Sequence, residues 1–138
     1  MSPPTGTYQI KNADYKSLAY IPDVNDGSSV AASKDSSNIS LNWNVTKLSN
    51  GNYTIQNYQH VSYASCGDPA QRNDHVVGRG AAKQWILTEA STKNQYTIAP
   101  SDSAALHWGL PNGDEGKAVV LAEAATEPKN QWIFQPTV

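Results

Sequence analysis

The sequence predicts an all-β protein built from three similar units, because two patterns recur along it with nearly the same period. A tryptophan that follows an amide side chain occurs three times, at Trp43, Trp85 and Trp132, and the spacings are 42 and 47 residues. A tyrosine within an alternating polar and apolar stretch also occurs three times, at Tyr8, Tyr53 and Tyr96. Self-similarity at a fixed period indicates a repeat architecture, and here the unit is about 43 residues long.

Each unit is predicted to hold four short strands. The alternating first strand falls at residues 6–12, 51–57 and 94–99. The second carries an aromatic residue and falls at 18–21, 61–64 and 106–109, so Tyr20, Tyr63 and Trp108 are predicted to be equivalent. A turn with an acidic residue leads to a third strand at 29–31, 75–77 and 118–121. The tryptophan strand is the fourth, which predicts twelve strands in all.

Three equal units can close around a threefold axis and share one core, and we expect the three repeated tryptophans to fill that core. Gln84 and Gln131, which precede two of them, are expected to hold turns. Little helix is predicted, because the stretch at 122–127 is short and stops at Pro128.

Composition excludes several classes of function. The 138 residues fit a single domain, with 16% charged residues, a net charge of −2 and no run of Lys or Arg, which argues against nucleic acid as a partner. No apolar run approaches the ~20 residues of a membrane-spanning helix, so membrane insertion is not expected. The start lacks a signal-peptide pattern and Cys66 is alone, so we expect a cytoplasmic protein, or one released without a leader.

The tryptophan motifs resemble those of a known family. Gln84-Trp85-Ile86 and Gln131-Trp132-Ile133 resemble the Gln-x-Trp motif of the ricin-B-like lectins, although glutamine and tryptophan are adjacent here. The resemblance runs from Gly6 to Pro136 and implies one β-trefoil domain over 1–138, with repeats at 6–50, 51–93 and 94–138. The chain is most similar to the small β-trefoils of mushrooms. Some of those proteins are lectins and others are protease inhibitors, and a shared fold does not choose between them.

A sugar site requires a flat apolar surface and a few fixed polar groups, and the third unit offers both. We expect Trp108 to be the stacking platform, with His107, Asn112, Asp114 and Asn130 supplying hydrogen bonds. The alternative is that Trp108 belongs to the core and Asp114 only forms a turn. In favour of the platform, glycine follows Trp108 and would allow a ligand to approach closely.

The other units carry fainter versions of this site. The first combines Tyr20 with Asp23 and Asp26, and the second combines Tyr63 with Asp68. The aspartate that the lectin family usually places at the end of the second strand is missing here, so the resemblance does not by itself imply the family's galactose specificity. We expect the third unit to bind most strongly, because tryptophan offers the largest ring.

The alternative function is protease inhibition by the second-unit loop at 66–74, which is about five residues longer than its counterparts. Arg72 and Asn73 lie near its tip, and an exposed arginine fits a trypsin-like specificity pocket. The expected partners are therefore glycans or glycoproteins, or else a protease, and a homodimer would raise avidity. No enzyme motif, cofactor site or metal-ligand spacing is found, so catalysis is not expected.

Overall fold

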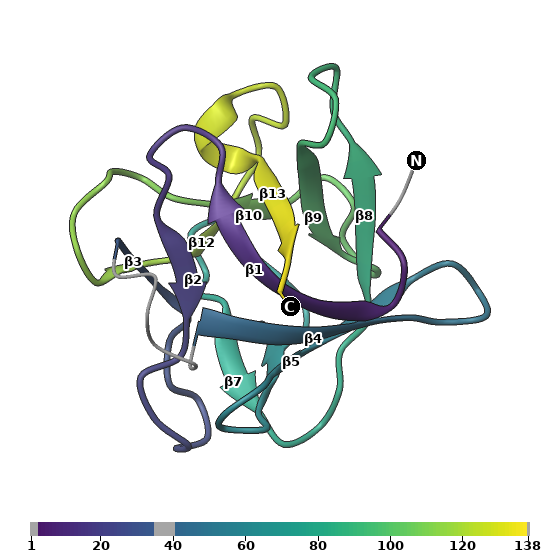
Figure 1. The fold of residues 1–138 in the computed structure, drawn as a ribbon, viewed down its shortest axis with the longest axis vertical. Coiled ribbons are helices and arrows are strands. Elements are labelled where there is room, and N and C mark those ends of the chain that lie inside the picture. Colours follow the sequence, from purple (N-terminus) through teal and green to yellow (C-terminus); the bar gives the residue numbers. More distant parts are fainter. Residues whose placement is uncertain (1–2, 35–40, 138) are drawn as a thin grey trace.

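The protein is all-β apart from one short 3₁₀ helix in the part of the chain that the computed structural model describes, residues 3–34 and 41–137 (Figure 1). In chain order the elements are β1 (Gly6–Asn12), β2 (Leu18–Tyr20), β3 (Ala31–Ser33), β4 (Asn42–Lys47), β5 (Tyr53–Asn57), β6 (Tyr63–Ser65), β7 (Val77–Arg79), β8 (Trp85–Glu89), β9 (Tyr96–Pro100), β10 (His107–Gly109), β11 (Lys117–Ala118), β12 (Val120–Ala122), η2 (Pro128–Asn130) and β13 (Trp132–Pro136). The described residues thus hold thirteen strands rather than the predicted twelve, because the two-residue β11 is additional. No described helix has the length and apolar character needed to cross a membrane.

The first and last strands of the three units form a closed barrel. Antiparallel pairing runs from β1 to β4, β5, β8, β9 and β13, and β13 pairs again with β1. Figure 1 shows β13 (yellow) lying beside β1 (purple). Closure leaves no barrel strand with an unpaired edge. The remaining strands form the hairpins β2–β3, β6–β7 and β10–β12.

The three hairpins are joined to one another by a ring of backbone hydrogen bonds. Val30 donates to Val76 at 2.7 Å, Val76 to Val119 at 3.0 Å, and Val119 back to Val30 at 2.8 Å. All three valines are fully buried. The ring therefore provides both the threefold arrangement and the partners that buried backbone groups require.

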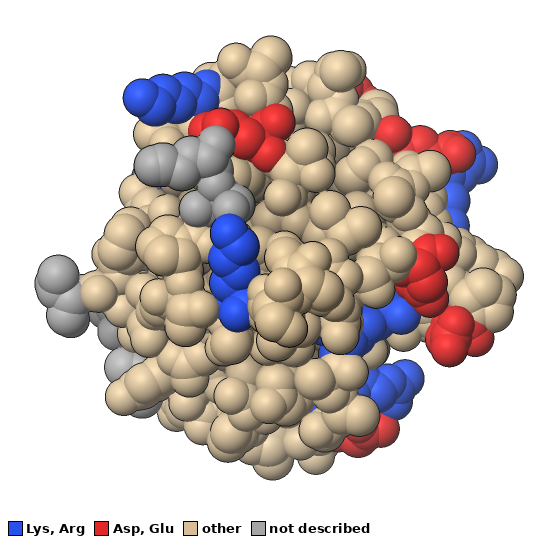
Figure 2. Space-filling model, turned by 90° about the vertical axis from the view of Figure 1, so that its right-hand side faces the viewer, with Lys and Arg blue, Asp and Glu red and all other residues tan. Residues whose placement is uncertain are grey.

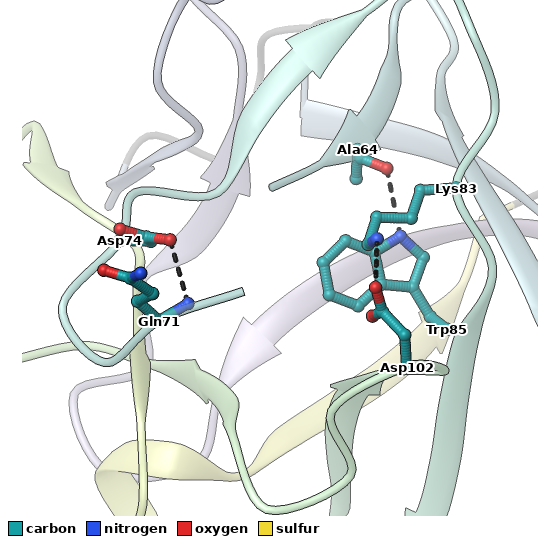
Figure 3. Close-up of polar contacts among 6 residues, drawn as sticks. All are labelled: Ala64, Gln71, Asp74, Lys83, Trp85 and Asp102. Atoms are coloured by element: carbon teal, nitrogen blue, oxygen red, sulfur yellow. Dashed lines mark hydrogen bonds and ion pairs between the residues drawn. The ribbon is translucent and has the colours of Figure 1, made fainter. Parts of the chain in front are cut away.

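The three repeated tryptophans fill the core, as predicted, and each is fully buried. Each indole nitrogen donates a hydrogen bond to the carbonyl of the middle residue of the second strand in its own unit. The pairs are Trp43 with Ala19 at 2.9 Å, Trp85 with Ala64 at 3.0 Å and Trp132 with Trp108 at 2.9 Å. Figure 3 shows the Trp85–Ala64 pair.

These pairs correct the predicted alignment of the second strands. The equivalent residues are Ala19, Ala64 and Trp108, so the predicted equivalence of Tyr20, Tyr63 and Trp108 is wrong. Tyr20 lies one residue after the equivalent position and Tyr63 lies one residue before it. Because side chains alternate between the two faces of a strand, a one-residue slip reverses the direction of every side chain. Trp108 therefore points inward, as the two alanines do.

Trp108 makes the third unit's contribution to the core larger than that of the others. Its ring packs edge-to-face against Trp85, with centroids 5.6 Å apart, and against Trp132 at 6.0 Å. Its own indole nitrogen is the one buried side-chain polar atom without a hydrogen-bond partner among the described residues. The ring acts there as an apolar body, and its N–H contributes no hydrogen bond.

This difference predicts that Trp132→Phe destabilises the protein more than Trp108→Phe does. Both changes remove similar volume, but Trp132→Phe also leaves the buried carbonyl of Trp108 without its donor. We expect an additional loss of about 1–3 kcal/mol of unfolding free energy for Trp132→Phe, measured by urea denaturation. Equal losses for the two variants would contradict the role assigned to the indole hydrogen bonds.

Candidate functional site

The third unit does not form the predicted sugar site, because its platform is inaccessible. Trp108 has no exposed surface, so it cannot stack on a ligand, and the alternative that it belongs to the core is correct. His107 is also buried, with its Nδ1 3.3 Å from the carbonyl oxygen of Ala122. The side chains of these two residues are part of the folded interior.

Asn130 is buried as well and holds the chain before β13. Its amide nitrogen donates to the carbonyl of Ala124 at 2.9 Å. Its Oδ1 lies only 2.2 Å from the point that a Cβ on Gly109 would occupy. Gly109 is therefore required for the packing of Asn130, and the predicted approach of a ligand at this glycine is wrong.

The remaining third-unit candidates, Asn112 and Asp114, form a turn. The side chain of Asn112 accepts the backbone N–H of Asp114 at 3.0 Å, and Lys117 donates its N–H to the Asp114 carbonyl at 3.2 Å. The Asp114 side chain is exposed. The structure thus separates these two residues from the three buried ones, and the five do not converge on one surface.

The first unit has a partly accessible ring and, three residues later in the chain, a fixed carboxylate. Tyr20 ends β2 and is half-buried. Three residues later, Asp23 accepts hydrogen bonds from the hydroxyl of Ser28 and from the backbone N–H of Asn25, the latter at 2.9 Å. The Ser28 hydroxyl, followed by the Asn25 N–H, lowers the pKa of Asp23. The carboxylate is therefore ionised and oriented at neutral pH.

Contacts with the second unit hold this hairpin in place. Asp26 forms an ion pair with Arg79 of β7 at 2.7 Å, and Gly27 donates its N–H to the carbonyl of Gly78 at 2.8 Å. Gly27 has φ of +87°, a conformation that glycine adopts readily. The ion pair is largely exposed and contributes little to stability, but it fixes the direction of the Asp26 carboxylate.

The two sugar-site candidates of the second unit differ in exposure and in the kind of element that holds them. Tyr63 begins β6 and is half-buried, opposite Gln56 of β5. Asp68 is exposed in the following loop. Asp74 accepts the N–H of Gln71 at 2.9 Å (Figure 3), which shapes that loop.

The loop considered for protease inhibition is tied to the third unit. Arg72 forms an ion pair with Glu123 at 3.1 Å, although its side chain remains 67% exposed. Asn73 donates its backbone N–H to Leu121 at 2.8 Å. The guanidinium of Arg72 therefore has a partner within the protein, and no contact in this loop favours an inhibitory role.

An apolar cleft of about 860 Å³, lined by the N-terminal segment and by residues of β1, β9 and β13, was missed by sequence reasoning. Phe134 packs edge-to-face between Tyr8 and Tyr96, with centroids 5.9 and 5.8 Å away. The hydroxyl of Tyr8 donates to the carbonyl of Pro4 at 2.6 Å, so the chain's own N-terminal segment forms one wall. Only the strand alternation of these tyrosines is visible in the sequence, and it does not show that they meet.

Cys66 is buried, and burial raises the pKa of its thiol to about 11. The nearby Lys83, paired with Asp102 at 3.3 Å (Figure 3), acts in the opposite direction but less strongly. The thiol is therefore protonated at neutral pH and unsuited to nucleophilic attack. Among the described residues no three His, Cys, Asp or Glu side chains are grouped as metal ligands.

No protein-family model and no curated protein sequence matches the chain. Solved structures do match it. The Rhizoctonia solani agglutinin has a TM-score of 0.91 and 20% identity over 99% of both chains. The Macrolepiota procera ricin B-like lectin, in complex with lactose, has a TM-score of 0.87 and 13% identity over 99% of both chains. The designed threefold-symmetric ThreeFoil has a TM-score of 0.88 and 15% identity over 96% of this chain and 99% of its own. The fold is thus a β-trefoil, similar to that of these lectins, as the resemblance implied.

The Asp23 hydrogen bonds predict a specific titration. Ser28→Ala should raise the pKa of Asp23 toward its ordinary value, whereas Ser29→Ala, a neighbouring change in the same loop, should leave it unaltered. A lowered folded-state pKa stabilises the protein above the ordinary pKa of aspartate, and that contribution is lost as pH falls through the lowered value. Carbon-detected NMR titration of the carboxyl group measures the shift, and an unchanged pKa in Ser28→Ala would exclude this hydroxyl as the main cause.

Burial of Cys66 predicts slow thiol chemistry in the native protein. At neutral pH its reaction with an aromatic disulfide reagent should be at least about 100-fold slower than in the urea-unfolded chain, because little thiolate is present. Absorbance of the released thiolate follows the rate. Comparable rates in the two states would show that the thiol is accessible.

Proposed function

We propose that this protein binds carbohydrate without transforming it, and that the first-unit hairpin is its principal sugar site. The observation that carries this proposal is the fixed, ionised Asp23 carboxylate three residues from the half-buried ring of Tyr20. A pyranose ring presents an apolar C–H face and a rim of hydroxyl groups. A phenol ring and an oriented acceptor are complementary to these two features.

The comparisons support a carbohydrate as the ligand. Two of the similar structures are an agglutinin and a ricin B-like lectin, and the second was solved with lactose bound. The match covers 99% of this chain and 99% of each of those two chains. The glycan partner and the absence of catalysis are proposed on this basis.

The proposed order of the sites differs from the sequence expectation. The third unit was expected to bind most strongly, but its tryptophan faces the core. Tyr20 in the first unit and Tyr63 in the second retain partial exposure. A single shallow site of this kind should bind with a Kd of about 0.1–1 mM, because a small ring buries little area. Binding through several sites would raise the avidity.

The low charge of the surface fits a neutral ligand. On the face in Figure 2 the acidic and basic residues are scattered and interspersed, with broad uncharged areas between them. A partner recognised mainly by charge, such as a nucleic acid, would require a basic patch, and that face shows none.

The proposal is tested by Tyr20→Ala and Asp23→Asn. A glycan array first identifies a bound sugar, and isothermal titration then measures its Kd for each variant. Each change should weaken binding about tenfold, which corresponds to about 1.4 kcal/mol, in protein that circular dichroism shows to be folded. Asp14→Asn removes an exposed carboxylate of the same unit outside the hairpin and serves as the matched control. A folded wild-type protein that binds no sugar on a broad array would overturn the proposed function.

A further inference from the structure

Four polar residues form a row across four neighbouring strands. The strand register pairs Thr7 of β1 with Asn44 of β4, Asn44 with Gln56 of β5, and Gln56 with Tyr63 of β6. Paired residues of antiparallel strands place their side chains on the same face of a sheet. These four side chains therefore lie next to one another even though they come from distant parts of the sequence.

A second row lies two residues further along the strands and hence on the same face. Gln135 of β13 is opposite Gln9 of β1, and Gln9 is opposite Asn42 of β4. Tyr58, just after β5, continues this row, since its backbone N–H donates to the Asn42 carbonyl at 2.8 Å. We call the eight residues of the two rows the polar face.

The polar face lies on the outside of the barrel. Along β1 the buried residues Tyr8 and Ile10 alternate with the half-buried Thr7 and Gln9. Tyr58 is 54% exposed, which makes it one of three large apolar side chains with high exposure in the described part of the chain. Each row therefore ends on an accessible tyrosine ring.

No member of the polar face is charged, whereas about a quarter to a third of surface residues usually are. The side chains are amides, phenols and one hydroxyl, and most can both donate and accept hydrogen bonds. Several are held in position: Thr7 donates to Asn44 Oδ1 at 2.9 Å, and Gln56 donates to the carbonyl of Val61 at 3.0 Å. The face thus presents oriented, neutral hydrogen-bonding groups.

The polar face is continuous with the first-unit hairpin. Tyr63 at the end of the first row is paired in register with Arg79 of β7. Arg79 in turn forms the ion pair with Asp26, close in sequence to Asp23. A ligand bound at the hairpin could therefore extend over Tyr63 and along the row.

We infer that the polar face binds the continuation of a neutral oligosaccharide whose end occupies the first-unit hairpin. This inference rests on the proposed carbohydrate-binding function and assigns it a class of ligand, an uncharged chain of several sugars. Adjacent strands are about 4.8 Å apart, so four strands span about 15 Å, more than one sugar ring covers. A protein partner would require an apolar interface centre, which the face does not present.

The test uses galactose, lactose and neutral galacto-oligosaccharides of increasing length, with the full chain; if the glycan array identifies another monosaccharide, the matching neutral series of that sugar replaces them. Wild-type affinity should rise about tenfold from the monosaccharide to the longest chain. The double variant Tyr58→Ala/Gln56→Ala should lose this rise and keep the wild-type affinity for the monosaccharide. Tyr58→Phe retains the ring and should retain the rise, and Gln59→Ala, an exposed amide outside the rows, is the matched control.

The outcomes separate the two proposals. If no member of the series binds and the glycan array is blank, the proposed function fails. If binding is present but independent of chain length, only the inference about the polar face is overturned. NMR provides a readout without mutation: the side-chain amide signals of Asn42, Asn44 and Gln56 should shift with the long chains and not with galactose. Unchanged chemical shifts of these signals at saturation with the long chains would also overturn the inference.

Discussion

The indole hydrogen bond is the constraint on which the rest of this structure depends. A tryptophan N–H buried in the barrel must find an acceptor, because an unpaired polar group in a low-dielectric interior is costly. The acceptor here is a backbone carbonyl of the overlying hairpin, as in the pair between Trp43 and Ala19. Each bond therefore sets the position of a hairpin over the barrel. The position of each hairpin also fixes the position of its loop. Tyr20 and Asp23 belong to the hairpin of the first unit.

The three units solve the same packing problem with different side chains. Where two units place an alanine under the barrel tryptophan, the third places Trp108. Its ring fills the core between two other tryptophans, so one large side chain occupies space that symmetry would distribute among three. Trp108 occupies the inward-facing position that Ala19 and Ala64 occupy in the other units, so the third unit gains core volume there and no stacking surface.

The sequence was sufficient to predict the class and the threefold plan, because the tryptophan and tyrosine repeats are long-range periodic signals. The phase of the second strands was not predictable in the same way. These strands have three residues each, too few for alternation to show which side chain points inward. Tyr20 and Trp108 look alike in sequence, and the difference is visible only in the folded chain, where Trp132 donates to the Trp108 carbonyl and the Trp108 ring is buried.

The requirement for Gly109 and the two polar rows were hidden for a related reason. Gly109 is fixed by the amide of Asn130, which is distant in sequence and comes close only in the folded chain. The rows combine residues of β13, β1, β4, β5 and β6, whose order across the sheet is not their order in the chain. A site assembled across strands leaves no local motif, whereas a site within one hairpin, such as Tyr20 with Asp23, does.

The pairing of β1 with β13 has a consequence for biosynthesis. The register joins Tyr8 to Pro136 and Asn12 to Trp132, so the barrel wall closes between segments separated by nearly the whole chain. Closing so long a loop is entropically unfavourable, and long-range pairings of this kind slow folding. During translation, β1 leaves the ribosome first and must wait for its last neighbour. Until then one edge of β1 is an open template for strands of other nascent chains, so the closing strand protects the newly made protein from aggregation.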